Sequence, residues 1–352
     1  MRKYATIAIK PGMELGEDVY TYQNELLIPA RTVLTEAHIK KLSHYSIMCA
    51  TIMEPADYAT THFEKVRLSD GFKTFESVYN ECLSSYKSLM MEFVLNGTAF
   101  SMNRLMELYA SIASRVPNGD TLLDYLYNML PSEDDMTHAH CFNSALIAGV
   151  FARWINLNQA DAELLIQCGF LYDIGKLKLP DELIWKADKL TQAEFNHIKA
   201  HTILGFQLLE PLHLDRHITN AALMHHERYD GSGYPSALRG EEIDRFAKYI
   251  AIIDSYEAMT SARIYRSTMH QFKMISNFEK AGFITYDESV LRPILSHIAG
   301  TQMGRKVRLN DDRVAEIILI NQKHLSRPML RTEDGYLIDL LSEPHLEIES
   351  IF

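Results

Sequence analysis

Residues 224–235, Met-His-His-Glu-Arg-Tyr-Asp-Gly-Ser-Gly-Tyr-Pro, have side chains that suit chemistry better than core packing. His225 follows apolar residues at helical spacing, which places it on the buried face of the preceding helix. Adjacent imidazoles can reach one metal ion when they lie at a helix end, where the chain turns. Gly231 and Gly233 let the chain double back at that point. Because an isolated histidine pair is more often structural, a metal site needs further ligands.

Four more polar residues fall on inner faces or at ends of predicted helices. His140 shares a helical face with apolar residues, and Asp254 lies on a face that is otherwise apolar. A carboxylate in such a position is costly unless a cation or hydrogen-bond donors meet it. Asp173 follows the end of one predicted helix, and His201 follows the end of another. These residues are therefore candidate ligands.

Together the candidates point to a metal centre. Neutral imidazoles combined with carboxylates suit iron, manganese, zinc or nickel better than magnesium or calcium. Two ions that share a bridging carboxylate can generate hydroxide at neutral pH and hold a phosphoryl oxygen. The chain has 15 histidines, so each one alone is more simply a buried structural residue, but the combined set favours metal. The set is His140, Asp173, His201, His225, His226 and Asp254.

The composition is that of a folded globular protein. The chain has 352 residues, of which 47% are hydrophobic and 23% are charged, and its formal net charge is −11. This charge argues against a nucleic-acid polymer or an anionic membrane as the main partner. The four cysteines lack CxxC spacing, which indicates neither a disulfide framework nor a thiolate zinc site. No membrane span or signal sequence is predicted, so we expect a cytoplasmic protein.

Hydrophobic periodicity divides the chain into four parts. We predict a small β-rich module over residues 1–54, a helical connector over 55–130, the metal-binding helical domain over 131–300 and a short β extension over 301–352. The fold class is therefore mainly α. In the connector, an apolar stripe over residues 75–93 indicates either core packing or a dimer face, through which the chain would form a homodimer.

The region from residue 131 to residue 271 resembles the HD-GYP family, a branch of the HD-domain metal phosphohydrolases that degrades cyclic di-GMP. This resemblance implies an all-helical HD bundle with a centre of two or three metal ions, often iron or manganese. Such a centre cleaves the cyclic dinucleotide to a linear dinucleotide or to GMP. The motifs occur in the family's order: Asp173-Ile174-Gly175-Lys176, His201 with Gly205, residues 225–235, and Asp254 followed by Ala258-Met259-Thr260 and Arg263-Ile264-Tyr265-Arg266.

The resemblance also implies roles for individual residues. All six candidate ligands would hold the metals, and Asp173 would bridge them. Lys176 would contact the scissile phosphate as a positive charge beside the metals. Tyr234 and Gly233 would shape the substrate loop. The chain ends are similar to flanks of family members at Pro11-Gly12-Met13 and Arg327-Pro328.

The roles of the neighbouring charged residues are less specific. Arg263 and Arg266 would meet phosphate or guanine, and the alternative is that they pair with Asp230 or Glu257. Glu227 and Asp230 are interpreted as groups that fix the loop or support the ligands rather than bind metal themselves.

Two positions depart from the family pattern. Tyr172 stands where the family has the histidine of its HD pair, and a phenol is a poor ligand unless the metal removes its proton. One ion would then be held weakly by His140, Asp173 and Asp254, or be missing. Met136 stands where some members have a glutamate for a third metal, so a trinuclear centre is not expected, although Glu133 or Asp135 could substitute.

Three functions remain open. The first is a cyclic di-GMP phosphodiesterase that uses a binuclear metal centre and tolerates Tyr172. The second is a degenerate domain that binds metal or a cyclic dinucleotide as a sensor without efficient turnover. The loss of a single ligand favours the enzyme, because loss of function usually removes several, and hydrolysis of another cyclic dinucleotide is a third interpretation.

Overall fold

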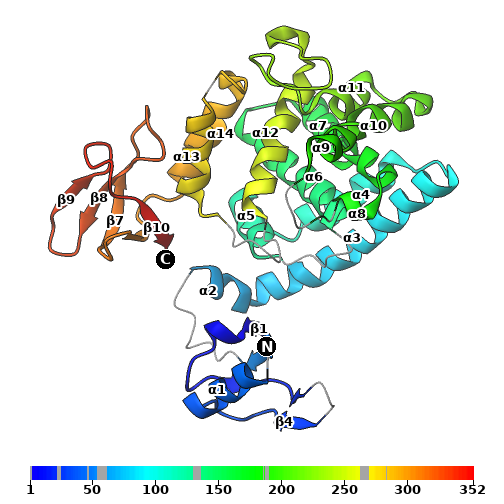
Figure 1. Cartoon of the computed structure of the whole chain (residues 1–352). Coiled ribbons are helices and arrows are strands. Elements are labelled where there is room, and N and C mark those ends of the chain that lie inside the picture. Colours follow the sequence, from blue (N-terminus) through cyan, green and yellow to red (C-terminus); the bar gives the residue numbers. More distant parts are fainter. Residues whose placement is uncertain are drawn as a thin grey trace. The chain divides into compact units, whose positions relative to one another are not determined.

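The computed structural model describes residues 2–21, 25–45, 47–53, 62–129, 136–184, 186, 190–261, 269–282 and 284–352. The chain forms two compact units, residues 1–68 and residues 69–352, which are described separately (Figure 1). The finer division into four parts stays a prediction. Among the described helices, none is long and apolar enough to span a membrane.

The first unit is a small β-rich module with one well-capped helix, as predicted. Its main sheet is antiparallel with strand order β1-β5-β2, and β3 pairs with β4 in a separate ribbon. A capping box between Thr35 and His38 starts α1, and Leu42 of that helix is fully buried. Along the described residues the elements are β1 (Arg2–Ala5), β2 (Glu14–Leu15), β3 (Val19–Tyr20), β4 (Leu26–Ile28), α1 (Glu36–His44), β5 (Cys49–Met53) and α2 (His62–Leu68).

The second unit is a helical bundle, which confirms the mainly α fold class. At its centre lies α6, which is apolar and buried on nearly every side because α7, α12 and α3 pack around it. Its helices are α3 (Asp70–Asn96), α4 (Met102–Ala113), α5 (Gly119–Asn128), α6 (Met136–Trp154), α7 (Gln159–Leu171), α8 (Asp181–Ile184), α9 (Gln192–Lys199), α10 (His201–Leu209), α11 (Arg216–Met224), α12 (Arg245–Thr260), α13 (Gln271–Ala281) and α14 (Glu288–Gly300). Short 3-10 turns follow α7 at η4 (Ile174–Lys178), α10 at η5 (Glu210–Leu212) and precede α12 at η6 (Gly240–Glu242).

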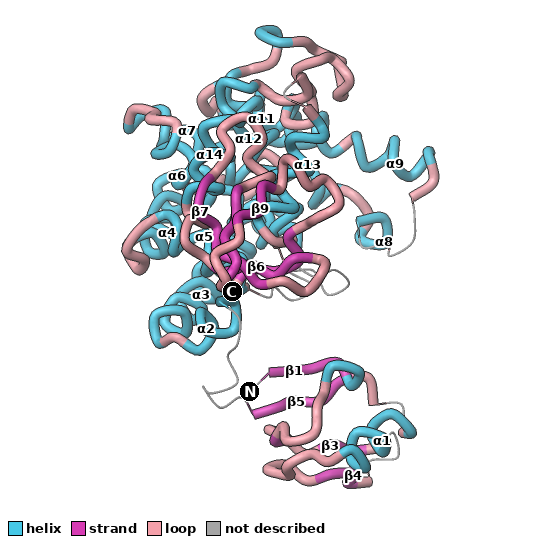
Figure 2. Tube along the Cα trace, turned by 90° about the vertical axis from the view of Figure 1, so that its left-hand side faces the viewer, coloured by secondary structure: helices cyan, strands magenta, loops and turns pink. Residues whose placement is uncertain are grey.

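A five-stranded antiparallel sheet forms the predicted β extension, and Figure 2 shows its strands side by side. The strand order is β10-β6-β7-β8-β9, and burial alternates along β6, as expected for a sheet with one packed face. The Leu325 amide donates to Glu279 Oε1 of α13 at 2.6 Å, which ties the sheet to the bundle. The strands are β6 (Lys306–Leu309), β7 (Val314–Leu319), β8 (Met329–Thr332), β9 (Leu337–Asp339) and β10 (Ile348–Ile351).

The apolar stripe of α3 packs inside the second unit. Phe75, Tyr79 and Tyr86 are buried there. The Tyr79 hydroxyl donates to Asn143 Oδ1 of α6 at 2.6 Å, and the Tyr86 hydroxyl donates to the Phe170 carbonyl of α7 at 2.5 Å. These buried side chains are therefore core packing and are not available as a dimer face.

The buried hydroxyl of Tyr86 gives a test of this packing. We expect Tyr86→Phe to lower the free energy of unfolding by about 1–3 kcal/mol, because the Phe170 carbonyl loses its side-chain donor in a buried place. The measurement is urea denaturation of both proteins. Tyr336→Phe, which changes an exposed tyrosine in the same way, should alter the value by less than about 0.5 kcal/mol. Equal values for the two variants would contradict the docking of α3.

Candidate metal centre

The bundle brings all six candidate ligands together in two groups. The first group, called the histidine group, is His201, His225 and His226. The second group is His140, Asp173 and Asp254. Within each group these atoms lie within 4.8 Å of one another. Helix α6 carries one ligand, one follows the end of α7, α10 begins with another, two follow the end of α11 and one lies on α12. The binding of metal by either group stays a prediction.

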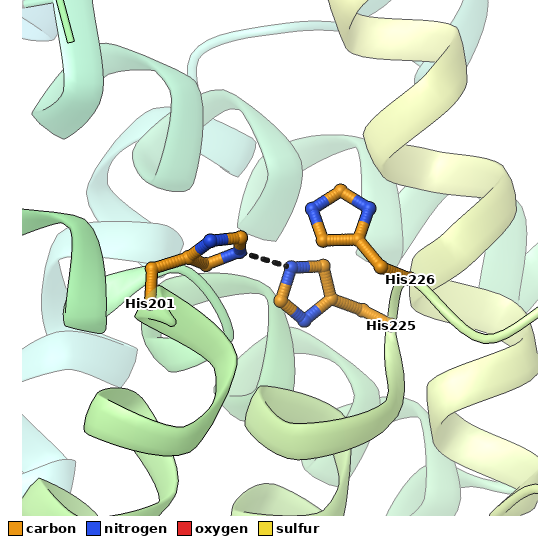
Figure 3. Close-up of side chains that lie close together, drawn as sticks. All are labelled: His201, His225 and His226. Carbon is orange, nitrogen blue, oxygen red and sulfur yellow. Dashed lines mark hydrogen bonds between the residues drawn. The ribbon is translucent and has the colours of Figure 1, made fainter. Parts of the chain in front are cut away.

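The first group points its unprotonated nitrogens at a common centre. His201 Nδ1 donates to the Ile198 carbonyl at 2.6 Å, and His225 Nδ1 donates to the Ala221 carbonyl at 3.0 Å. These bonds assign the protons of neutral rings to Nδ1 and leave lone pairs on both Nε2 atoms, which lie 3.2 Å apart (Figure 3). Two facing lone pairs repel each other unless a cation binds both. This donor set fits a transition-metal ion.

Burial keeps these histidines neutral. It lowers the pKa of His225 to about 4, and the neighbouring His201 contributes to this effect. Burial also lowers the pKa of His201 and, together with His225, holds the pKa of His226 well below its usual range. At neutral pH His201 and His225, whose protons lie on Nδ1, therefore have no proton that a metal ion must displace from Nε2.

Asp173 faces both groups from between them. The residue is fully buried; its Oδ1 lies 3.3 Å from His201 Nε2, and its Oδ2 lies 3.5 Å from His140 Nε2. Lys176 Nζ lies 2.5 Å from Oδ2, but neither oxygen has a hydrogen-bond donor in good geometry among the described residues. Burial opposes ionisation, but Lys176 and the histidines hold the pKa of Asp173 well below its usual range. Its two oxygens therefore each face a different group of candidate ligands.

The second group already contains a hydrogen-bond donor, the hydroxyl of Tyr172. This hydroxyl lies 2.6 Å from His140 Nε2 and donates to Asp254 Oδ1 at 3.3 Å. The ring is fully buried, and burial with the charges of Asp254 and Asp173 raises its pKa well above the usual range, so it is a neutral phenol. Where the family pattern has a histidine ligand, this chain thus has a hydroxyl group that forms hydrogen bonds with His140 and Asp254.

Glu257, one helical turn after Asp254 on α12, is a member of the site that the sequence interpretation did not place. Its carboxylate accepts from His140 Nδ1 at 2.5 Å and from Asn143 Nδ2 at 2.9 Å. Burial opposes a charge on His140, but the carboxylates of Glu257 and Asp254 outweigh this and raise the pKa of His140 to about 10. Glu257 therefore orients His140. The signal was available, because an acid at i+3 from Asp254 shares its face.

The loop after His226 is held by its own acids, as predicted. Glu227 accepts from the Ser236 amide at 2.7 Å and the Leu238 amide at 3.1 Å, and Asp230 accepts from the Ser232 amide at 2.9 Å. Gly233 is required because a side chain there would collide with the backbone of Glu227 and His226.

Tyr234 completes this loop next to the first group of ligands. Its ring stacks on His226 with the centroids 4.7 Å apart and the planes inclined by 25°. The loop therefore places an aromatic side chain against a candidate ligand. Arg263 and Arg266, the other predicted substrate-binding residues, lie outside the described residues, as do Glu133 and Asp135.

Known proteins with related sequences share this region. A family model described as HD domain matches residues 124–290. The cyclic di-GMP phosphodiesterase response regulator RpfG of Xanthomonas campestris pv. campestris (strain 8004) is 36% identical over 147 residues, which is 41% of this chain and 39% of RpfG. The cyclic di-GMP phosphodiesterase PA4108 of Pseudomonas aeruginosa is 30% identical over 236 residues, which is 66% of this chain and 55% of that protein.

A third relative is named for a different substrate. The 3'3'-cGAMP-specific phosphodiesterase 1 of Vibrio cholerae is 34% identical over 142 residues, which is 40% of this chain and 33% of that protein. The chain thus spans from about a third to just over half of the length of these curated relatives.

A solved structure shows the same fold. The HDG"Y"P protein Bd1817 from Bdellovibrio bacteriovorus superposes with a TM-score of 0.52 at 13% sequence identity, over 84% of this chain and 99% of that one. The shared arrangement therefore extends well beyond the residues matched by the family model. Residues 124–290 thus match an HD domain, and the related phosphodiesterases support the resemblance of this region to the HD-GYP family.

Proposed function

We propose that this protein is a metal-dependent phosphodiesterase that hydrolyses a cyclic dinucleotide, with cyclic di-GMP as the first candidate. The observation that carries the proposal is the pair of facing Nε2 atoms of His201 and His225, 3.2 Å apart beside the buried carboxylate of Asp173. Relatives named as phosphodiesterases of cyclic di-GMP and of 3'3'-cGAMP support this substrate class. Because one of these relatives is named for 3'3'-cGAMP, we take this dinucleotide as the alternative substrate.

Two ions are proposed for the centre. His201, His225, His226 and Asp173 would hold one, and His140, Asp173 and Asp254 would hold the other. Iron or manganese suits this mixture of imidazole and carboxylate best, and zinc or nickel is the alternative. When bound, such ions activate water for attack on phosphorus and neutralise charge on the phosphoryl oxygens.

The chain supplies a further positive charge through Lys176. Burial opposes its charge, but Asp173 raises the pKa of Lys176, so the ammonium group persists. It is fixed by the ion pair with Asp173 and lies on the side of the carboxylate that faces His140. With ions bound at Asp173, this ammonium group beside the site would stabilise negative charge that develops on a phosphoryl group.

One observation favours the alternative of a sensor without efficient turnover. The Tyr172 hydroxyl lies within hydrogen-bonding distance of both His140 and Asp254, which satisfies these groups without an ion. A centre with one ion in the histidine group could still bind a phosphate. Turnover and metal content distinguish the two functions.

The direct test is incubation of the metal-loaded protein with cyclic di-GMP and either manganese or ferrous iron. We expect a linear dinucleotide or GMP as product. Asp173→Ala should lower the rate by at least about 100-fold, because loss of a group that supports a ligand already costs about 10–100-fold. Binding of cyclic di-GMP without product under each metal would reject hydrolysis and favour the sensor.

Substitution of Tyr172 by histidine tests the second ion. We expect Tyr172→His to retain more metal after purification without added metal, because the imidazole supplies the ligand that the phenol does not. Elemental analysis of both proteins gives the number of ions per chain. Tyr172→Phe, which removes the hydroxyl without adding a ligand, is the control and should not show the gain. An unchanged content in Tyr172→His would mean that position 172 is not a ligand position.

The pKa values predict that the two ions bind with different pH dependence. His140, with a pKa of about 10, must release a proton to bind metal, whereas His225, with a pKa of about 4, is already deprotonated. Affinity at the second group should thus rise by about 100-fold between about pH 6 and about pH 8, since one proton leaves per ion. Affinity at the histidine group should change little over that range. Manganese titrations of metal-free protein, followed by calorimetry, measure both, and equal pH dependence would contradict the assignment.

A further inference from the structure

Helix α9 presents an aromatic ring and a cation beside the metal centre. None of its side chains is buried, and Phe195 is 40% exposed. Lys199 follows one turn later, and its Nζ lies 4.8 Å from the ring centroids of both Phe195 and Tyr234. The ammonium group therefore lies between two aromatic side chains. An apolar ring and a cation on an unburied helix face have no evident role in the packing of the bundle.

Lys199 is a cation without a carboxylate partner among the described residues, unlike the other lysines near the site. Lys176 pairs with Asp173 at 2.5 Å, and Lys186 pairs with Glu194 at 2.6 Å. An ammonium group between aromatic faces is attracted to the rings, which do not neutralise it as a carboxylate would. It is therefore available to an anion from outside the chain.

The position of this cation is fixed relative to the candidate ligands. The Tyr234 ring, which Lys199 contacts, stacks directly on His226. Helix α9 starts with a capping box between Thr191 and Glu194 and passes through a single residue into α10, which begins with His201. One aromatic ring thus separates Lys199 from one candidate ligand, and one residue separates it from another.

We infer that Phe195, Lys199 and Tyr234 bind the part of the cyclic dinucleotide that is not being cleaved. This inference rests on the proposed function. A cyclic dinucleotide carries two phosphates in one ring, so a phosphate at the metal centre places the other a short distance away. Lys199 binds this second phosphate by a charge-assisted hydrogen bond, and Phe195 stacks on the adjoining base. The cation thus meets the phosphate, and the ring beside it meets a purine that is joined to that phosphate.

A purely structural role for Lys199 gives different expectations. A lysine in the last turn of a helix stabilises the helix dipole, and in that case its removal would affect folding rather than ligand choice. The test therefore needs a substrate that contains only the phosphodiester that is cleaved. Bis(4-nitrophenyl) phosphate has one phosphodiester, no second phosphate and no purine.

The experiment compares Lys199→Met and Phe195→Ala with the unaltered protein, all loaded with manganese. We expect each substitution to raise the Kd for cyclic di-GMP, measured by rapid mixing before turnover, by about 10-fold or more. The rate with bis(4-nitrophenyl) phosphate should stay unchanged. Lys199→Met should also weaken the salt dependence of Kd, because a charge contact is lost. Lys323→Met, which removes an exposed lysine of the β extension, is the matched control and should change none of these values.

Other outcomes separate the two proposals. An unchanged Kd in Lys199→Met, with a normal Kd in the unaltered protein, overturns this inference and leaves the proposed function intact. Equal losses with both substrates, or a lowered melting temperature, also overturn it, because they indicate a structural role. If the unaltered protein neither binds nor hydrolyses cyclic di-GMP, the proposed function fails and this inference fails with it.

Discussion

Taking a carboxylate fully out of water costs several kcal/mol unless cations or donors surround it, and Asp173 is in that situation. Lys176 supplies one positive charge, but the two oxygens otherwise face imidazole nitrogens. The end of α7, the start of α10 and the end of α11 all meet at this carboxylate. The glycine at position 175 permits that approach, because a side chain there would collide with the His201 carbonyl. The bundle is thus assembled around a charge that its own residues only partly compensate.

The two groups of candidate ligands differ in how much they need a cation. In the histidine group, the Nδ1 protons of His201 and His225 are used by backbone carbonyls, so the facing nitrogens can only accept. In the other group, Tyr172 provides a donor, and His140 has carboxylates on both of its nitrogens. Tyr172, where the chain departs from the family pattern, therefore makes the two groups unequal. The facing nitrogens of the first group need a cation to balance their lone pairs, whereas His140 and Asp254 of the second group have partners within the chain.

The sequence was sufficient for features that follow from local periodicity. The inward faces of His140 and Asp254 follow from spacing and residue type. The family resemblance supplied the grouping of distant ligands. Periodicity could not decide whether the α3 stripe was core or a dimer face, because both uses bury the same side chains.

Contacts that depend on side-chain direction were not predictable. Glu257 shares a face with Asp254, but nothing in the spacing distinguishes a partner of His140 from a partner of an arginine. The position of Lys199 between two rings depends on a loop that closes 35 residues later in the chain, at Tyr234. Likewise, the sequence identified Tyr172 as a departure from the family pattern, and the hydrogen bonds of its hydroxyl became visible only in the folded bundle.

The overall charge of the chain limits how an anionic substrate can be bound. A net charge of −11 gives no long-range attraction for a cyclic dinucleotide, whose two phosphates are negative. The attraction must therefore act at short range, within about 8–10 Å at physiological salt. Lys176 is neutralised by Asp173 as long as no ion competes for that carboxylate, so metal binding at Asp173 would add positive charge twice: through the ion, and by releasing the lysine. In such a protein, metal loading and substrate affinity are coupled through one carboxylate.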